Sequence, residues 1–331
     1  MSGVRSVAVE DDSPKRATRG RTPSSLPWRS FARAHENLPQ DRGGFWHEHV
    51  PVQSLCLYRI GVGLLLSLES LYRLPHAVEL YSSAGFHIGT LARFAPPPWA
   101  ARGLCTLLAL TSILLCVGLM TRAATLMTLG LWSFLYGIDS INEKAIHSVL
   151  IVVLTILAFS HCGARLSLDH HLRAKRGKPV GPDRVCILPL RLLQIEFAQV
   201  YLFSSLTKML NTEWNRGIVL ERSLQSHWAT VFGVWVSNWV GPRVAQIAGL
   251  GAIYYELLAS FLLFVPWTRR WVIAVGLAFH LGIQATLSIG SLGCHFMLAL
   301  LLLYPDPEAV AAWLHRMRDM LPARAPVEGA P

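Results

Sequence analysis

Lys208 is the residue whose type and position most directly suggest chemistry, because it stands at the end of an apolar stretch, in VYLFSSLTKMLNTEW. Residues 189–210 are apolar enough to form a membrane-spanning helix, and an ionisable side chain within such a helix is costly. A lysine at the outer end is either an interfacial anchor that extends to the lipid headgroups or a desolvated amine that acts as a base. The lysine alone leaves both interpretations open.

Polar residues recur on one face of the same predicted helix. Gln194, Tyr201 and Lys208 are spaced by seven residues, so they lie within about 20° of one another per step around an α-helix. Ser204 and Ser205 lie four and three residues before Lys208. The pattern predicts a polar stripe that leads to the amine. On spacing alone, a seam of hydrogen bonds between helices is the favoured interpretation.

A histidine supplies a second candidate for acid–base chemistry. His147 opens the predicted span 145–163, in SINEKAIHSVLIVVL, and we expect it near the same outer face as Lys208. An isolated interfacial histidine is more often structural. Two acid–base groups at one depth on neighbouring helices give a catalytic role more weight.

Further polar residues lie within later apolar segments. His280 and Gln284 are four residues apart, and a serine follows after four more, which predicts another polar stripe. Glu256 lies near the middle of the segment 244–265, where a carboxylate needs a partner or a proton. We expect that partner to be His280 or Tyr201. For Arg59 and Glu69, in the first apolar segment, a structural ion pair is favoured.

The elements that position these residues are predicted to be membrane-spanning helices. Of the 331 residues, 52% are hydrophobic and 15% are charged, against about 25% charged in soluble proteins. A bilayer core about 30 Å thick needs roughly 20 apolar residues per helix. Eight segments qualify: residues 54–73, 101–121, 122–138, 145–163, 189–210, 244–265, 270–288 and 291–305. The predicted fold is therefore an all-α, polytopic membrane bundle, in which the second and third helices form a tight hairpin.

The distribution of lysine and arginine predicts how this bundle is oriented. With a cytoplasmic N-terminus, twenty of these residues fall on the cytoplasmic side and seven on the outer side, as the positive-inside rule requires. The net charge of +10 then reflects membrane topology, and we expect no nucleic-acid partner. The predicted organisation is a basic, partly disordered cytoplasmic tail over residues 1–50, a transmembrane domain over 51–305 and a cytoplasmic tail over 306–331.

Two outer connections, residues 74–100 and 211–243, are too long for plain turns and mix apolar with polar residues. Tryptophans in the second connection are Trp214, Trp228, Trp235 and Trp239. Because tryptophan favours the headgroup level of a bilayer, we expect amphipathic or re-entrant helices lying over the outer face.

The cysteines and the known sequence motifs narrow the chemistry. The six cysteines show no CxxC or Cys/His spacing, which argues against a metal site, and we expect mostly reduced thiols. A disulfide between Cys105 and Cys294, both toward the outer side, is left open. The sequence contains no nucleotide-binding loop, HExxH or GxSxG motif. The remaining classes are membrane redox or carbon chemistry, transport, and assembly.

Four stretches of the sequence resemble the HTTM superfamily, the membrane domain shared with vitamin K-dependent gamma-glutamyl carboxylases. They occur in family order and cover most of residues 55–300. The stretches are RIGVGLLLSLESLYRLP with ELYSSAG (59–85), NEKAIHSVLIVVLTILAFSHCGARLSLD (142–169), QVYLFSSLTKMLNTEWNRG (199–217) and YELLASFLLFVPWTRR with AFHLGIQATLSIG (255–290). No single motif is diagnostic, and the ordered set carries the resemblance.

The resemblance implies roles for residues of this chain. Lys208 matches the lysine proposed to deprotonate vitamin K hydroquinone, and His147 in AIHSVL matches the other proposed catalytic group. The implied cofactor is reduced vitamin K or menaquinol, with carbon dioxide and oxygen as co-substrates. Residues expected to bind the cofactor are Tyr201, Ser204, Trp214, Glu256, His280 and Gln284. The resemblance thus favours a carboxylase-like membrane enzyme, or enzyme subunit, that modifies a peptide or protein at the outer face with Lys208 as base.

The chain also departs from the carboxylases. Ile146 stands where they have asparagine, Trp214 is one residue further from the lysine, and their large lumenal domain has no counterpart here. We therefore expect a separate soluble partner to recognise the substrate. The chain is similar to compact bacterial proteins that mature sporulation-delaying-type toxins, which suggests a bacterial inner membrane. The alternative is a non-catalytic maturation, immunity or assembly protein for a secreted peptide, which would tolerate changes at Lys208 and His147.

Overall fold

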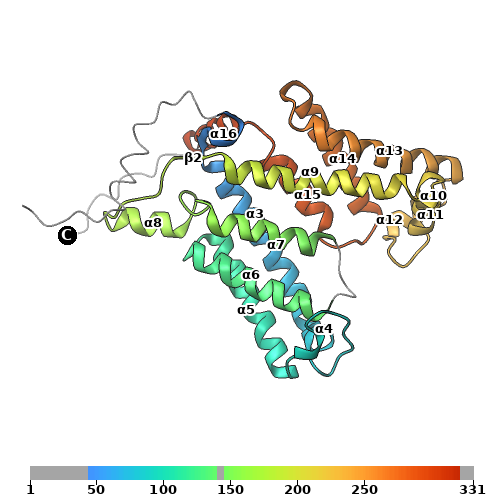
Figure 1. Ribbon diagram of the computed structural model, residues 1–331, viewed down its shortest axis with the longest axis horizontal. Helices are drawn as coiled ribbons and strands as arrows, with labels where there is room; N and C mark the ends of the chain where they lie inside the picture. The colour runs from blue at the N-terminus through green and yellow to red at the C-terminus, as the bar shows by residue number, and fades with distance from the viewer. Residues whose placement is uncertain (1–43, 140–144, 321–331) are drawn as a thin grey trace, which may run out of the picture. The chain divides into compact units, whose positions relative to one another are not determined.

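The computed structural model describes residues 44–139 and 145–320, apart from the side chains of Ala145 and Leu292. These residues are mostly α-helical (Figure 1), which confirms the predicted all-α fold. A small antiparallel sheet also forms, in which β1 (His49–Pro51) pairs with β2 (Arg184–Cys186). Most of the predicted N-terminal tail lies outside the described residues. The described part of the predicted C-terminal tail is mainly the helix α16 (Pro307–Asp319).

The first group of long helices packs around a tight hairpin. Its members are α3 (Gln53–Arg73), α5 (Pro98–Val117), α6 (Thr121–Ile138) and α7 (Ala145–Phe159). α5 packs against both α3 and α6, and α6 packs against α7. Gly118 ends α5 with a φ of 72°, a left-handed conformation that favours glycine, and its N–H donates to the carbonyl of Leu114. The hairpin predicted between the second and third apolar segments is therefore confirmed.

The second group of long helices carries most of the candidate site residues. Its members are α9 (Leu188–Met209), α13 (Pro242–Leu262), α14 (Pro266–Thr286) and α15 (Leu292–Leu302). α9 packs along α13, α14 packs against α15, and α15 contacts α3 (Figure 1). α9, α13 and α14 each have proline in the first turn. Proline is tolerated there because a backbone N–H at that position has no acceptor within the helix.

Three described helical segments are long and apolar enough to cross a membrane: Gln53–Tyr81, Pro98–Val117 and Pro242–Leu262. A fourth results if Gly293–Leu302 and Pro307–Asp319, which meet at 89°, form one broken span. The apolar helices support the prediction of a membrane protein, but the count of eight spans is not confirmed. α7 has only 15 residues and α15 only 11, and α9 contains arginine, glutamate and lysine.

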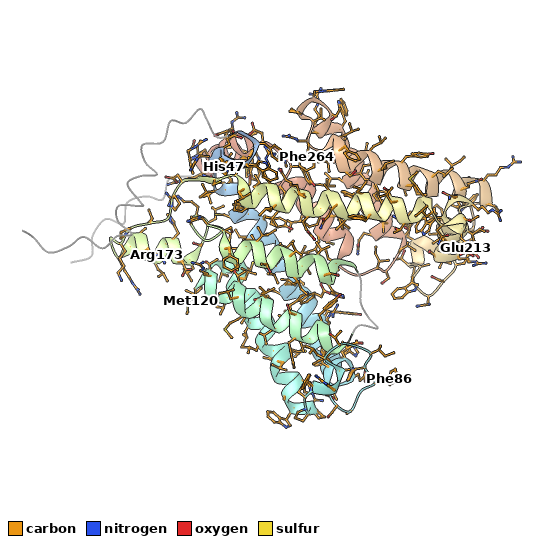
Figure 2. The ribbon with its side chains drawn as sticks, viewed as in Figure 1. His47, Phe86, Met120, Arg173, Glu213 and Phe264 are labelled. Atoms are coloured by element: carbon orange, nitrogen blue, oxygen red, sulfur yellow. The ribbon has the colours of Figure 1, made fainter. Side chains whose placement is uncertain are left out.

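The two long connections contain short helices, in keeping with their mixed composition. The first holds η1 (Leu74–His76), α4 (Ala77–Tyr81) and η2 (Ala92–Phe94); the second holds α10 (Thr212–Asn215), α11 (Ile218–Leu224) and α12 (Val231–Ser237). Figure 2 shows the side chains, with Phe86 in the first connection and Glu213 in α10. Phe232, Trp235 and Trp239 are exposed, as lipid-facing side chains would be. Their placement over the outer face of a membrane stays a prediction.

Arg59 forms no ion pair with a described residue, so the favoured expectation for it was wrong. Its side chain is fully buried and donates hydrogen bonds to four backbone carbonyls. The acceptors belong to Leu115, Cys116, Cys162 and Leu166. These carbonyls lie at the end of α5 and in the connection from α7 to α8 (Leu168–Lys175). A buried guanidinium needs several acceptors, and these carbonyls supply them. Arg59 therefore joins α3 to the end of α5 and to the connection between α7 and α8.

Candidate functional site

A large cavity lies among α7, α9, α13, α14 and α15, and α10, α11 and α12 complete its wall. Its volume is about 1150 Å³, and most of its lining side chains are apolar. Polar lining residues contributed by α9 are Glu196, Gln199, Tyr201, Ser204, Thr207 and Lys208. We call this space the Lys208 cavity. It is large enough for a ligand with a long hydrocarbon portion.

Lys208 and Glu256 face each other in the wall of this cavity. The amine Nζ of Lys208 lies 2.5 Å from Oε1 and 2.6 Å from Oε2 of the Glu256 carboxylate. The two side chains are only 17% and 8% exposed. The pair forms because α9 and α13 pack along each other, which brings residues 48 positions apart into contact. The expectation that His280 or Tyr201 would be the partner of Glu256 was therefore wrong.

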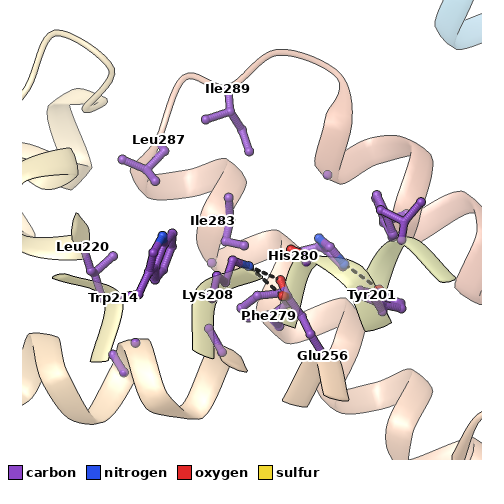
Figure 3. A pocket seen from close by; sticks show the side chains of 18 of the residues that line it. Tyr201, Lys208, Trp214, Leu220, Glu256, Phe279, His280, Ile283, Leu287 and Ile289 are labelled. Carbon is purple, nitrogen blue, oxygen red and sulfur yellow. Dashed lines mark hydrogen bonds and ion pairs between the residues drawn. The ribbon is translucent and has the colours of Figure 1, made fainter. Parts of the chain in front are cut away.

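The Lys208 amine points into the cavity, where it also approaches an aromatic ring (Figure 3). Nζ lies 5.0 Å from the centre of the Trp214 ring, within the range of a cation–π interaction. Trp214 follows the N-cap Asn211, whose side chain accepts hydrogen bonds from the backbone N–H groups of Glu213 and Trp214. A short capped helix thus holds the tryptophan beside the amine.

A second polar pair lies further along the cavity wall. The hydroxyl of Tyr201 lies 2.6 Å from Nε2 of His280, and both side chains are buried. The ring of Phe296 packs on both, with centroids 4.9 Å from Tyr201 and 5.0 Å from His280. This packing orients the pair, and Figure 3 shows it alongside Lys208 and Glu256. One site therefore holds four of the predicted residues as two hydrogen-bonded pairs.

The other predicted cofactor-binding residues divide between the cavity and its surroundings. Ser204 and Trp214 line the cavity. Gln284 is not among the described lining residues. Its amide donates to the carbonyl of Gly290 at 3.0 Å, and it packs against Gly293. Gln284 therefore shapes the turn between α14 and α15.

His147 lies in a different cluster from Lys208. Its Nε2 is 2.7 Å from Nη2 of Arg73 and 3.5 Å from Oε1 of Glu69, and its ring contacts the rings of Trp132 and Tyr136. Although Ser148 and Val149 line the Lys208 cavity, His147 is not among its described lining residues. The sequence placed Lys208 and His147 near the same end of their helices. The orientation of α7 about its axis turns His147 toward α3 and away from the Lys208 cavity.

The contacts of two ionisable residues within the predicted spans, Glu196 and Glu69, were not predicted from the sequence. Glu196 lines the Lys208 cavity, is 7% exposed and accepts a hydrogen bond of 2.7 Å from Gln199. Its three-residue spacing to Gln199 on a helix was a usable signal. Glu69 also accepts from Ser291 at 2.7 Å, across 222 residues of sequence. No local pattern could have indicated that contact.

The cysteines and the candidate metal ligands add no further centre within the described residues. All six cysteines are free thiols, so Cys105 and Cys294 do not pair. Among residues 44–139 and 145–320, no three histidine, cysteine or acidic side chains cluster closely enough to hold a metal ion.

Comparison with known families gives a match that spans most of the chain. The family model described as the HTTM domain matches residues 47–308. This range includes both polar pairs, the Arg59 network and all the long helices. No curated protein and no solved structure matches the chain.

Proposed function

This chain belongs to the HTTM domain family, and on that premise we propose that it is a carboxylase-like integral membrane enzyme, or the membrane subunit of one. The observation that carries the proposal is the Lys208–Glu256 pair in the wall of a large apolar cavity. An amine and a carboxylate that share a proton away from water form a unit for acid–base chemistry.

The chemistry of the pair follows from its surroundings. The pair lies in a mostly apolar cavity, so a proton moves between the amine and the carboxylate away from bulk water. Transfer of the proton from Nζ of Lys208 to Glu256 leaves a neutral amine that can accept a proton from a bound ligand. Lys208 is therefore the base in this proposal, and Glu256 is the group that takes its proton first.

A quinol-type cofactor fits the residues of the cavity. Its hydrocarbon tail needs an apolar wall, and its hydroxyl groups need hydrogen-bonding partners, which Lys208, Tyr201 and Ser204 would supply. Such a cofactor supplies, by reaction with oxygen, a base stronger than any amine, which carboxylation with carbon dioxide requires. Tyr201 and His280 would orient the ligand, because their own hydrogen bond and the Phe296 ring hold them in place. The apolar wall would exclude water from the reacting groups.

The finer parts of the proposal concern the membrane and the substrate. We place eight spans in a bacterial inner membrane with both termini cytoplasmic, which puts Lys208 at the outer end of α9. The substrate would be a peptide or protein at the outer face, presented by a separate soluble partner. His147 would act through the Glu69 and Arg73 side chains that it contacts.

A non-catalytic maturation or assembly protein is the second candidate. The observation that favours it is the exposed aromatic surface of α12 and the residues that follow, which would suit a hydrophobic peptide. In that case the Lys208–Glu256 pair would only join α9 to α13. The two functions differ in whether the lysine must lose a proton.

The decisive experiment replaces Lys208 by arginine, which keeps the positive charge but does not give up a proton at physiological pH. The full chain, reconstituted in lipid nanodiscs, is supplied with reduced menaquinol, and oxygen consumption is measured. We expect a loss of at least about 100-fold, the usual contribution of a general base. Lys178→Arg, the same exchange at an exposed position outside the cavity, is the matched control. Unchanged consumption in Lys208→Arg would reject the base role.

A further inference from the structure

A second cavity lies outside the candidate active site, where α6 begins, α7 ends and α8 begins. Its volume is about 390 Å³. Basic side chains that line it are Arg122, His161, His170 and Arg173. We call it the basic cavity. Figure 2 labels Met120 and Arg173 beside the beginning of α6 and on α8, the two helices that flank it.

The acidic residues around the basic cavity are already engaged. The Asp169 carboxylate accepts hydrogen bonds from the N–H groups of Met120 and Thr121, at 2.9 and 2.8 Å, and from the Thr121 hydroxyl at 3.0 Å. Asp183 is paired with Arg165 at 2.5 Å. Asp169 lines the same cavity and interacts electrostatically with Arg173, but its single negative charge offsets only one of the two positive charges that Arg122 and Arg173 bring.

Arg122 and Arg173 carry the charge that is left over. Both are exposed, and the carboxylate of Asp169 interacts electrostatically with Arg173 without forming a close ion pair with either arginine. Lys175, Arg176 and Lys178 extend the positive surface beyond the cavity. This concentration of charge attracts an anion, and two guanidinium groups at one opening select an anion with several oxygens.

Apolar side chains stand next to this charge. Phe159 lines the cavity and is 71% exposed, and Leu166 and Leu168 nearby are 44% and 38% exposed. A water-exposed surface would not favour this combination, whereas the headgroup level of a membrane presents phosphate and hydrocarbon together. Basic pockets beside membrane helices bind anionic headgroups for this reason.

We propose that the basic cavity binds a phosphate group through Arg122 and Arg173, as a site separate from the Lys208 cavity. The same chemistry serves the headgroup of an anionic phospholipid or free phosphate. Arginine suits the task because its planar fork donates two parallel hydrogen bonds to neighbouring phosphate oxygens. The proposal does not depend on the chemistry assigned to Lys208.

The test measures ligand binding to the full chain in neutral detergent. Phosphatidylglycerol and diacylglycerol of equal chain length are titrated and followed by native mass spectrometry, and inorganic phosphate is titrated by calorimetry. Arg122→Ala/Arg173→Ala removes the proposed ligands. Lys175→Ala/Lys178→Ala removes the same charge from the neighbouring surface and is the matched control. Arg122→Gln and Arg173→Gln, tested singly, give the same comparison if the double variant does not fold.

We expect the Arg122→Ala/Arg173→Ala variant to bind phosphatidylglycerol about 10-fold more weakly than the wild type, as the loss of charge-assisted hydrogen bonds predicts. The control variant should stay within about 2-fold of wild type. Diacylglycerol, which lacks phosphate, should not distinguish the variants. If inorganic phosphate binds the wild type and the arginine variant weakens that binding, soluble phosphate is the ligand. If inorganic phosphate does not bind, the ligand is the lipid headgroup. The proposal would be overturned if both double variants bound phosphatidylglycerol equally weakly. It would also be overturned if diacylglycerol bound the wild type and the Arg122→Ala/Arg173→Ala variant with different affinities.

Discussion

The Lys208 ammonium contacts both oxygens of the Glu256 carboxylate, at 2.5 and 2.6 Å, from a helix 48 residues away in the sequence. The contact joins α9 to α13 at the wall of the Lys208 cavity. It has a structural consequence, because each buried charge offsets the other. In the proposed function it also has a chemical one, because the proton between the two groups would be within reach of a ligand bound in the cavity.

Removal of one member of this pair should destabilise the protein more than removal of both. Lys208→Met or Glu256→Leu alone leaves a buried charge without its partner, which costs about 3 kcal/mol, whereas the double variant replaces the pair by apolar side chains and should lie within about 1 kcal/mol of wild type. Thermal unfolding in detergent measures the difference. Additive losses in the double variant would contradict the pairing.

Arg59 should be among the least replaceable residues of the fold. Arg59→Met leaves four backbone carbonyls without their donor, and we expect a loss of about 3 kcal/mol in the free energy of unfolding. The yield of monodisperse protein and its unfolding midpoint report the effect. Arg102→Met, at an exposed position on α5, is the control and should change stability by less than about 0.5 kcal/mol.

Gly118 should not tolerate a side chain at the hairpin between α5 and α6. Its φ of 72° is left-handed, and an added Cβ would lie 2.5 Å from Cβ of Ser167 and 2.7 Å from Nη1 of Arg59. Gly118→Ala should therefore cost more than the about 1 kcal/mol of the left-handed conformation alone. Gly177→Ala is the matched control, because Gly177 has a φ of 61° and no atom within 4 Å of an added Cβ. Equal unfolding midpoints for the two variants would show that the close packing around Gly118 does not matter.

Asp169 should make stability depend on acid pH. Burial raises the pKa of Asp169, but the hydrogen bonds from the N–H groups of Thr121 and Met120 outweigh that effect and hold the pKa below its ordinary value of 3.8. A carboxyl with a lowered folded pKa stabilises the protein above its unfolded pKa, and this stabilisation is lost as the pH falls through the folded pKa. The Asp169 carboxylate accepts from the N–H groups at the beginning of α6, so Asp169→Asn, which removes the negative charge, should cost up to about 1 kcal/mol at neutral pH and less at acid pH.

The pH experiment has an internal control in Asp183. The hydrogen bond from Arg165 lowers the pKa of Asp183, but its side chain is 72% exposed, so solvent screens the interaction. Unfolding midpoints of Asp169→Asn, Asp183→Asn and the wild type are compared from neutral pH to about pH 3. This range ends below the ordinary aspartate pKa of about 3.9. A difference between wild type and Asp169→Asn that does not shrink toward acid pH would contradict the capping role.

Local spacing was enough to predict the helices and the position of polar residues on them. The apolar segments predicted the long helices, and the short interval between the second and third predicted the hairpin that Gly118 closes. The seven-residue spacing predicted that Tyr201 and Lys208 share a face of α9, and both line the same cavity. Such predictions succeed because the period of an α-helix depends only on the backbone.

Contacts between helices could not be predicted in this way. The sequence by itself determined that Lys208 and Glu256 each sit in an apolar helix at a cost, but only the packing of α9 on α13 decided that they offset each other. Only the rotation of α7 decided that His147 meets Arg73 rather than the Lys208 cavity. A periodic pattern specifies the direction of a side chain relative to its own helix axis. Which helix lies in that direction depends on the fit of all the packed side chains together, and that fit exists only in the folded chain.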